Sequence, residues 1–285
     1  MIDGQWQIGN DYTFGSNTQV VVSGVEFEGY EVNNYDFNRE NTDEIVMGRD
    51  SFKPGLVTFE LTALDNYSVS TEMDVPGFQR AREVYEEFTK YWRGDQIRNL
   101  WNQYLPLAYK RHGTERLIYG RPRKLTPLRV GQRKGNQPFT CQYQTADTFT
   151  YSRMEYYEDG PVSTLGTRNV SVRRDLLDGQ ADTWFAIQIE GPITNPTVEI
   201  GPDMRIKLQT TLAAGKLIEI SSYPWRRRVI NSDGYTLSAF LIEDSPYMDE
   251  LKIPGGEATD FGLSGSGTSG NTLLRVLWRE AYYAY

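Results

Sequence analysis

The sequence predicts a mainly β fold of two β-sandwich domains, the first of which carries one amphipathic helix. Two patterns lead to this prediction. Short runs of alternating apolar and polar residues end at Gly, Pro, Asn or Asp, as strands of sandwiches and barrels do. Only one stretch has the three- and four-residue apolar spacing of a helix. The 285 residues accommodate one large domain or two ordinary ones, and a hydrophobic content of 39% is close to the globular average.

The first domain begins with strands whose alternation defines a core face. In Leu56–Leu64, every second residue from Val57 to Ala63 is apolar, so this face is predicted to be buried. Two later strands flank the loop Lys110–Thr114, whose glycine supplies the positive φ that a hairpin turn requires. The strands predicted for this domain are Gln19–Ser23, Tyr30–Val32, Leu56–Leu64, Leu105–Tyr109 and Glu115–Tyr119.

One segment of the first domain has a helical pattern. From Phe78 to Trp92, apolar residues recur at steps of three and four with charged residues between them, which predicts a helix over about residues 76–93. Pro76 fits the first turn, where a backbone N–H has no partner, and Gly94 fits the end. The aromatic stripe of this helix is predicted to cover one face of the first sheet.

A new series of strands begins after Tyr151, which predicts two domains of residues 1–150 and 151–285. The spacing of these strands is that of a β-sandwich. The Gly- and Ser-rich segment Gly262–Gly270 has a loop composition and is predicted to join two late strands. The strands predicted for this domain are Trp184–Ile189, Thr197–Ile200, Arg205–Leu208, Leu217–Ile220, Leu237–Leu241 and Leu273–Trp278.

The chain contains one cysteine and one histidine, which excludes several kinds of site. Cys141 has no partner for a disulfide within the chain, and a zinc site of several Cys and His ligands cannot be assembled. His112 would have to serve any Ser-His-Asp or Cys-His relay, yet its neighbours predict a solvated turn residue. We therefore expect no catalytic residues, no cofactor and no metal site.

The sequence also argues against a membrane as a partner. No stretch reaches the roughly 20 consecutive apolar residues of a membrane helix, and Met1–Asn10 lacks the features of a signal peptide. We expect a soluble chain that is made in the cytoplasm and does not insert into a membrane.

Charge is distributed unevenly along the first domain. Residues 1–74 hold 14 acidic against 3 basic residues, whereas residues 110–134 hold 9 basic residues against Glu115 alone. The two stretches either neutralise each other within one fold or face neighbouring copies in a head-to-tail contact. The second interpretation assigns a subunit interface to Arg116, Arg121, Arg123, Lys124 and Arg129. A net charge of −8 and the lack of a helix-turn-helix, zinc-finger or RNP pattern argue against specific nucleic-acid binding.

Several short patterns combine, in order, into a resemblance to a known family. The patterns are Tyr119–Arg123, Thr140–Asp147 and Glu190–Pro196. In the sequence they come after an amino-terminal strand pair, the helix and a hairpin. Over nearly its whole length the chain resembles the distal tail proteins of siphophages, especially the minor tail proteins of phages with actinobacterial hosts. One departure is that Asp147 is followed by Thr148, where many family members have proline.

The resemblance implies a fold and a structural, non-enzymatic function. Distal tail proteins form a hexameric ring, in which an amino-terminal β-sandwich with a helix builds the ring and a galectin-like carboxy-terminal sandwich faces outward. The implied partners are copies of the same chain, the tail tube protein and the tail hub or baseplate, with DNA passing through the lumen. The implied location is the tail tip of the virion, assembled from a late protein in the host cytoplasm.

Two carbohydrate-related alternatives stay open. A carbohydrate-cleaving enzyme needs two carboxyl groups about 5–10 Å apart, one of them with a raised pKa. A carbohydrate-binding protein needs an aromatic ring beside polar side chains, which Trp225 and the following Arg226–Arg228 would supply for a host surface sugar. The candidate carboxylates are Glu155, Glu158, Asp159, Glu243, Asp244, Asp249 and Glu250.

Overall fold

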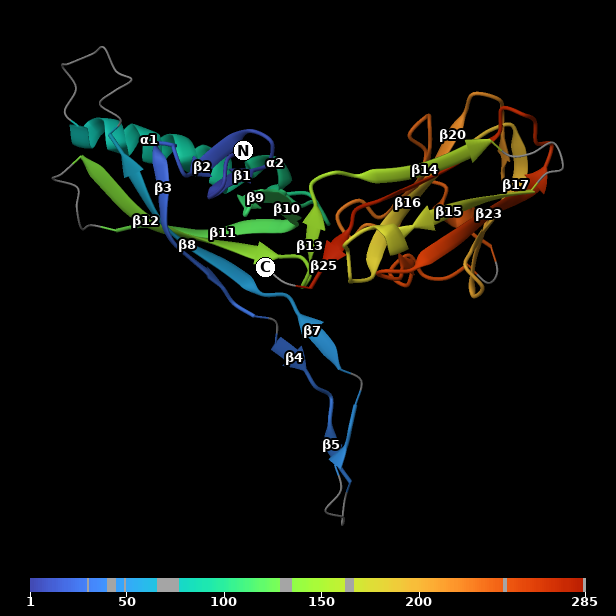
Figure 1. Ribbon diagram of the computed structural model, residues 1–285, viewed down its shortest axis with the longest axis horizontal. Coiled ribbons are helices and arrows are strands. Elements are labelled where there is room, and N and C mark those ends of the chain that lie inside the picture. The colour runs from blue at the N-terminus through green and yellow to red at the C-terminus, as the bar shows by residue number, and fades with distance from the viewer. Residues whose placement is uncertain are drawn as a thin grey trace. The chain divides into compact units, whose positions relative to one another are not determined.

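The computed structural model describes residues 1–29, 31–39, 45–48, 50–65, 77–128, 135–161, 167–242 and 245–283. These residues form two compact units, one ending at Thr150 and the other beginning at Tyr151. Each unit consists of β-sheets around its own hydrophobic core (Figure 1). The predicted mainly β fold of two β-sandwiches is thereby confirmed.

The first unit contains two antiparallel sheets, with strand orders β2-β1-β9-β10 and β11-β12-β8-β3. Alternate residues of β8 from Val57 to Ala63 are at most 1% exposed, so the predicted core face is confirmed. The strands are β1 (Gln5–Ile8), β2 (Tyr12–Gly15), β3 (Val20–Phe27), β8 (Leu56–Leu64), β9 (Leu107–Arg111), β10 (Thr114–Ile118), β11 (Gly120–Pro127) and β12 (Asn136–Thr145).

Helix α1 (Gly77–Arg93) packs on the β11-β12-β8-β3 sheet with the predicted aromatic stripe, which also contacts β2 of the other sheet. The ring of Phe88 lies 5.5 Å from that of Phe14 on β2 and 5.1 Å from that of Phe139 on β12. Trp92 stacks on Phe88 at 5.4 Å, and its indole N–H donates to the Lys124 carbonyl oxygen on β11. Contacts of this kind on both sheets fix the position of the helix end. Pro76 lies outside the described residues.

The β9–β10 hairpin has a tighter turn than the sequence predicted. Arg111 pairs with Thr114, so the turn consists of His112 and Gly113 alone. Both residues have positive φ, 51° and 77°, which is the geometry of the two-residue turns that match strand twist. The predicted loop Lys110–Thr114 is therefore too long, because its outer residues extend the strands. His112 is exposed in this turn, as predicted.

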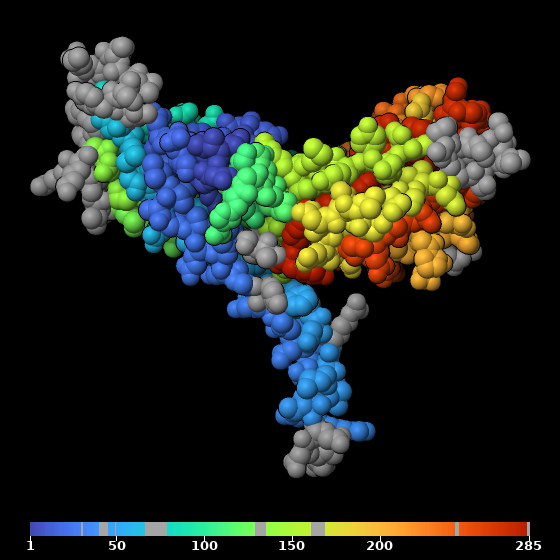
Figure 2. All heavy atoms as spheres, in the orientation of Figure 1, coloured from blue at the N-terminus to red at the C-terminus, as the bar shows by residue number. Residues whose placement is uncertain are grey.

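Between β3 and β8 the described residues of the segment 28–55, which are 28–29, 31–39, 45–48 and 50–55, form a two-stranded ribbon, here called the arm. Strand β4 (Glu31–Asn33) pairs with β7 (Ser51–Lys53), and β5 (Phe37–Asn38) pairs with β6 (Ile45–Val46). Because β3 and β8 are neighbours in one sheet, the arm continues two adjacent strands of that sheet, and it projects as a thin ribbon (Figures 1 and 2).

The second unit also contains two antiparallel sheets. One has the order β14-β24-β16-β20-β21 with β22 beside β16, and the other has β15-β23-β17-β18 with β19 beside β17. The strands are β14 (Tyr156–Pro161), β15 (Thr167–Arg173), β16 (Thr183–Glu190), β17 (Ile193–Ile200), β18 (Met204–Lys207), β19 (Thr211–Leu212), β20 (Leu217–Ser221), β21 (Arg228–Asn231), β22 (Lys252–Ile253), β23 (Ala258–Ser266), β24 (Leu273–Trp278) and β25 (Ala281–Tyr282). Strand β13 (Thr150–Ser152) spans the boundary between the units.

Two predictions for this unit are wrong. Leu237–Leu241 contains the 3₁₀ turn Ser238–Phe240 in place of a strand, because the Phe240 N–H bonds locally to the Leu237 carbonyl oxygen. The first half of Gly262–Gly270 belongs to β23, between β15 and β17. A Cβ at Gly265 would lie 2.7 Å from the Ile193 side chain, so glycine there reflects crowding between strands rather than loop flexibility.

A fully buried ion pair connects distant segments of the second unit. Arg174 and Glu280 are both 0% exposed, and the guanidinium Nη2 lies 3.0 Å from the carboxylate Oε2. Arg174 also donates to the carbonyl oxygens of Ile253, Pro254 and Ala181. Its N–H groups are thus satisfied, which a buried charge requires.

We predict that Glu280→Gln destabilises the protein by about 3 kcal/mol or more, because it leaves the buried Arg174 charge without a counter-charge. Denaturant unfolding monitored by circular dichroism measures the change. As a matched control, Asp159→Asn breaks the solvent-accessible pair with Arg275 and should cost less than about 1 kcal/mol. Equal losses for the two variants would contradict this account of the buried pair.

We further predict that residues 1–150 and 151–285 fold as separate domains, since each unit has its own core. Each half, expressed alone, should unfold cooperatively with strand-rich circular dichroism. A half that lacks a cooperative thermal transition would show that the two units fold only together.

Candidate subunit interface of the first unit

The arm exposes apolar side chains that it cannot bury by itself. In the β4–β7 ribbon, the paired Val32 and Phe52 are 49% and 63% exposed. In the β5–β6 ribbon, the paired Phe37 and Val46 are 59% and 37% exposed. An isolated two-stranded ribbon is marginally stable in water, and exposed apolar groups of this kind mark interaction surfaces. The arm therefore has the character of an interface.

The arm is also acidic. In the sequence, residues 28–55 contain seven Asp and Glu against three basic residues, Arg39, Arg49 and Lys53. Glu31 lies 2.8 Å from the Lys53 Nζ, and the hydrogen bond and charge of Lys53 lower the pKa of the Glu31 carboxyl from its ordinary value. The Asp36 carboxylate accepts a hydrogen bond from the Gly48 N–H across the ribbon. Glu28 and Asp50 are exposed and form no ion pair with a described residue.

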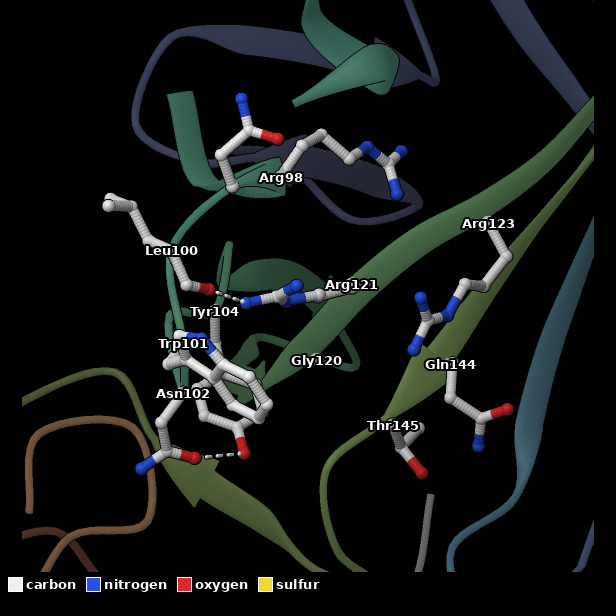
Figure 3. A pocket seen from close by; sticks show the side chains of 11 residues that line it. Arg98, Leu100, Trp101, Asn102, Tyr104, Gly120, Arg121, Arg123, Gln144 and Thr145 are labelled. Carbon is white, nitrogen blue, oxygen red and sulfur yellow. Dashed lines mark hydrogen bonds between the residues drawn. The ribbon is translucent and has the colours of Figure 1, made fainter. Parts of the chain in front are cut away.

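A hollow of about 420 Å³ lies on the same unit, at the end of the β11–β12 pair (Figure 3). Its wall is formed by helix α2 (Asp95–Arg98), the following loop as far as Tyr104, and the start of β11. Arg98, Arg121 and Arg123 point toward the hollow from three sides (Figure 3). Gln144 and Thr145 of β12 complete the lining.

Local sequence explains why the chain takes this shape. Gly94 has a φ of +57°, which allows the chain to leave α1 and start α2 at once. Gly120 lies so close to β12 that a Cβ there would collide with the Gln144 carbonyl oxygen. Arg121 then holds the loop: its Nε donates to the Gln103 carbonyl oxygen and its Nη2 to that of Leu100, each at 2.6 Å.

The three guanidinium groups form a cluster of like charge. Within the described parts of the chain, none of Arg98, Arg121 and Arg123 forms an ion pair. Burial, followed by the nearby charges of Arg123 and Arg121, lowers the pKa of Arg98 from its ordinary value. The Asp95 carboxylate opposes this shift, but the neighbouring like charges are unfavourable for one another, so the hollow is electrostatically suited to an anion.

Apolar surface borders this charge. Trp101 is 96% exposed and Leu100 is 53% exposed, both beside the hollow. A fully exposed tryptophan next to arginine is a composition typical of binding hot spots. The hollow thus combines a wall of arginine side chains with an apolar rim.

The structure brings some of the predicted interface residues together and separates others. Arg121 and Arg123 line the hollow, whereas Lys124 is exposed on β11 outside it and Arg116 lies on β10. Arg129 lies outside the described residues. Sequence reasoning missed Arg98 and Trp101, because no local pattern links the segment after α1 to β11.

The carbohydrate-related candidates lie on the second unit. Trp225 stacks on Tyr223 at 5.0 Å, so one face of its ring is covered, and Arg226 and Arg228 both pair with Glu219. Among the carboxylates, Asp159 pairs with Arg275. Glu243 and Asp244 lie outside the described residues.

Within the described residues, no group of three or more His, Cys, Asp or Glu is placed to hold a metal ion. The described helices include none that is long and apolar enough to span a bilayer.

Comparison with solved structures shows that the fold of this chain is similar to the folds of phage tail-tip and baseplate proteins. The SPP1 Dit protein, described as a paradigm of the hub adsorption apparatus in phages that infect Gram-positive bacteria, matches with a TM-score of 0.64 and 13% identity, over 97% of this chain and 99% of that one. Chains of the phage p2 baseplate in its activated conformation, with Sr or Ca, match with TM-scores of 0.58 and 0.57 at 12% and 11% identity, over 99% of both chains.

These matches confirm, at the level of fold, the resemblance to distal tail proteins that the sequence indicated. No family model and no curated protein matches the sequence itself.

We predict that Arg121→Ala loosens the loop after α2, since each hydrogen bond from a charged donor contributes about 1–3 kcal/mol. Hydrogen exchange of the amides of residues 99–104 should accelerate. Arg123→Ala is the matched control, because Arg123 holds no backbone carbonyl in the described structure, and it should leave this exchange unchanged. Unchanged exchange in Arg121→Ala would contradict the positioning role.

Proposed function

We propose that this chain is a structural subunit of a phage tail tip, which forms a ring of identical copies between the tail tube and the hub or baseplate. The observation that carries the proposal is the fold match over at least 97% of this chain and 99% of each matched chain. Both sandwiches and their order along the chain take part in this similarity. The proposed role is non-enzymatic, and the proposed location is the virion tail.

The surface of the first unit supports assembly with other copies. It carries an acidic arm with exposed apolar side chains, and separately a basic hollow with an exposed Trp101. Two different, complementary patches on one chain are what a head-to-tail contact requires, and such contacts close into rings when the rotation allows. Apolar side chains would supply most of the binding energy, while charge would select the orientation.

The second unit is proposed to face outward as a galectin-like sandwich. Binding of a host surface sugar by this unit stays a prediction; the stacking of Trp225 on Tyr223 leaves only part of that ring accessible. The net charge of −8 suits a ring through which DNA passes, since a basic wall would retain the phosphates. Specific nucleic-acid binding is not part of the proposed function.

We predict that the purified chain assembles into closed rings, most simply of six copies. Mass photometry should show one species at a whole multiple of the 32.7 kDa chain mass, and negative-stain averages should show rotational symmetry. A chain that stays monomeric at micromolar concentration in low and in high salt would contradict the ring.

A further inference from the structure

We propose that the arginine hollow receives carboxylate side chains of the acidic arm of a second copy, and that Arg98, Arg123 and Trp101 make the contact. The inference rests on the proposed ring and adds to it the site and the chemistry of one subunit contact. Of the residues of the predicted basic interface, it assigns Arg123 to binding the neighbour and Arg121 to shaping the site.

The hollow retains donors for carboxylates. The Nε of Arg98 donates to the Arg93 carbonyl oxygen, which leaves both of its Nη groups for a ligand. Arg121 has committed Nε and Nη2 to the loop, whereas Arg123 is exposed and bonds to no described residue. The planar fork of arginine matches a carboxylate or a phosphate with two parallel hydrogen bonds, so Asp and Glu side chains are suitable ligands.

The arm has the matching composition. Its exposed acids accompany exposed aromatic and aliphatic side chains, including Phe37 at 59% and Met47 at 75%. These apolar groups complement Trp101 and Leu100 at the rim of the hollow. An extended ribbon also fits the size of the hollow, whose 420 Å³ holds a few side chains and not a folded element.

The hollow lies at the root of the arm of its own copy. Gln144 and Thr145, which line it, both donate hydrogen bonds of 2.9 Å to the carbonyl oxygen of Gly55, where the arm returns to β8. Each copy would therefore receive a neighbour's arm beside the place from which its own arm departs. Contacts of this kind are head-to-tail, because the arm of each copy binds to the hollow of the next, and head-to-tail contacts are those that can close into a ring.

A phosphate chain is the competing ligand, because arginine and exposed tryptophan also bind single-stranded nucleic acid. Two observations favour the acidic arm. The cationic residues form one hollow rather than a groove that could follow a polymer backbone. The net charge of −8 repels a polyanion, while the chain itself supplies the acidic segment.

Carbodiimide crosslinking of the full-length chain tests the contact directly. In Arg123→Lys, the reagent forms an amide only between an amine and a carboxylate in contact. Mixing ¹⁴N and ¹⁵N chains identifies links between copies by mass spectrometry. We expect crosslinks between residue 123 of one copy and carboxylates in the arm of another copy. The matched control Arg111→Lys carries its amine on the exposed end of β9, outside the hollow, and should give none.

Charge reversal gives the second measurement. Arg123→Glu should raise the apparent dissociation constant of the assembly by roughly 10-fold or more, as loss of a charged hot-spot contact does. Arg111→Glu makes the same charge change outside the hollow and should shift it by less than about 3-fold. A thermal melt equal to that of the parent chain shows that each variant is folded.

The possible failures are distinguishable. Rings that form equally well with Arg123→Glu, and that give no crosslink from residue 123 to the arm, would overturn the inference and leave the proposed ring intact. A parent chain that never assembles would overturn both. Binding of a single-stranded oligonucleotide to the parent, lost in Arg123→Glu, would assign the hollow to phosphate and also overturn the inference.

Discussion

The packing of one aromatic stripe against one sheet and the neighbouring β2 is the interaction on which the surface of the first unit depends. Phe88 contacts rings from both sheets, and Trp92 is tied to the backbone of β11. The end of α1 is thereby held at β11, and the positive φ of Gly94 turns the chain at once into α2. Arg98 consequently lines the same hollow as Arg123 on β11. The aromatic contacts of α1 thus bring together Arg98 and Arg123, which are far apart in the sequence.

The two interface features differ in how each is stabilised. The hollow is built on a rigid base, because Arg121 bonds to two loop carbonyls and Gly120 allows the close approach of β11 and β12. The arm is held by the ladder hydrogen bonds of two short strand pairs and by a few exposed polar contacts, such as that of Glu31 with Lys53, and its apolar pairs are exposed to water. If the weakly stable arm binds to the rigid hollow of a neighbour, it becomes ordered on binding. The entropy lost in this ordering lowers the affinity, but it also means that the arm becomes ordered only when the copies assemble.

Elements that are defined by a residue pattern within one continuous segment could be predicted from the sequence. The alternation in Leu56–Leu64 and the spacing of α1 gave both the element and its buried face, because each period is local. The segment Gly262–Gly270 was misassigned, since composition reports backbone freedom and not the space left by neighbouring strands. For the same reason the charge of Arg121 was predictable, while its bonds to the loop and its proximity to Arg98 were not.

The continuity between the arm and its sheet has a mechanical consequence. Both strands of the arm run directly into β3 and β8, and β8 is hydrogen-bonded along its length to both β3 and β12. Ladder hydrogen bonds lie perpendicular to the strands, so tension along the arm loads them in shear, all at once, rather than one after another. Force reaching the arm from a neighbour would therefore spread through the sheet instead of peeling a single strand away. A thin ribbon can in this way serve as a strong tether.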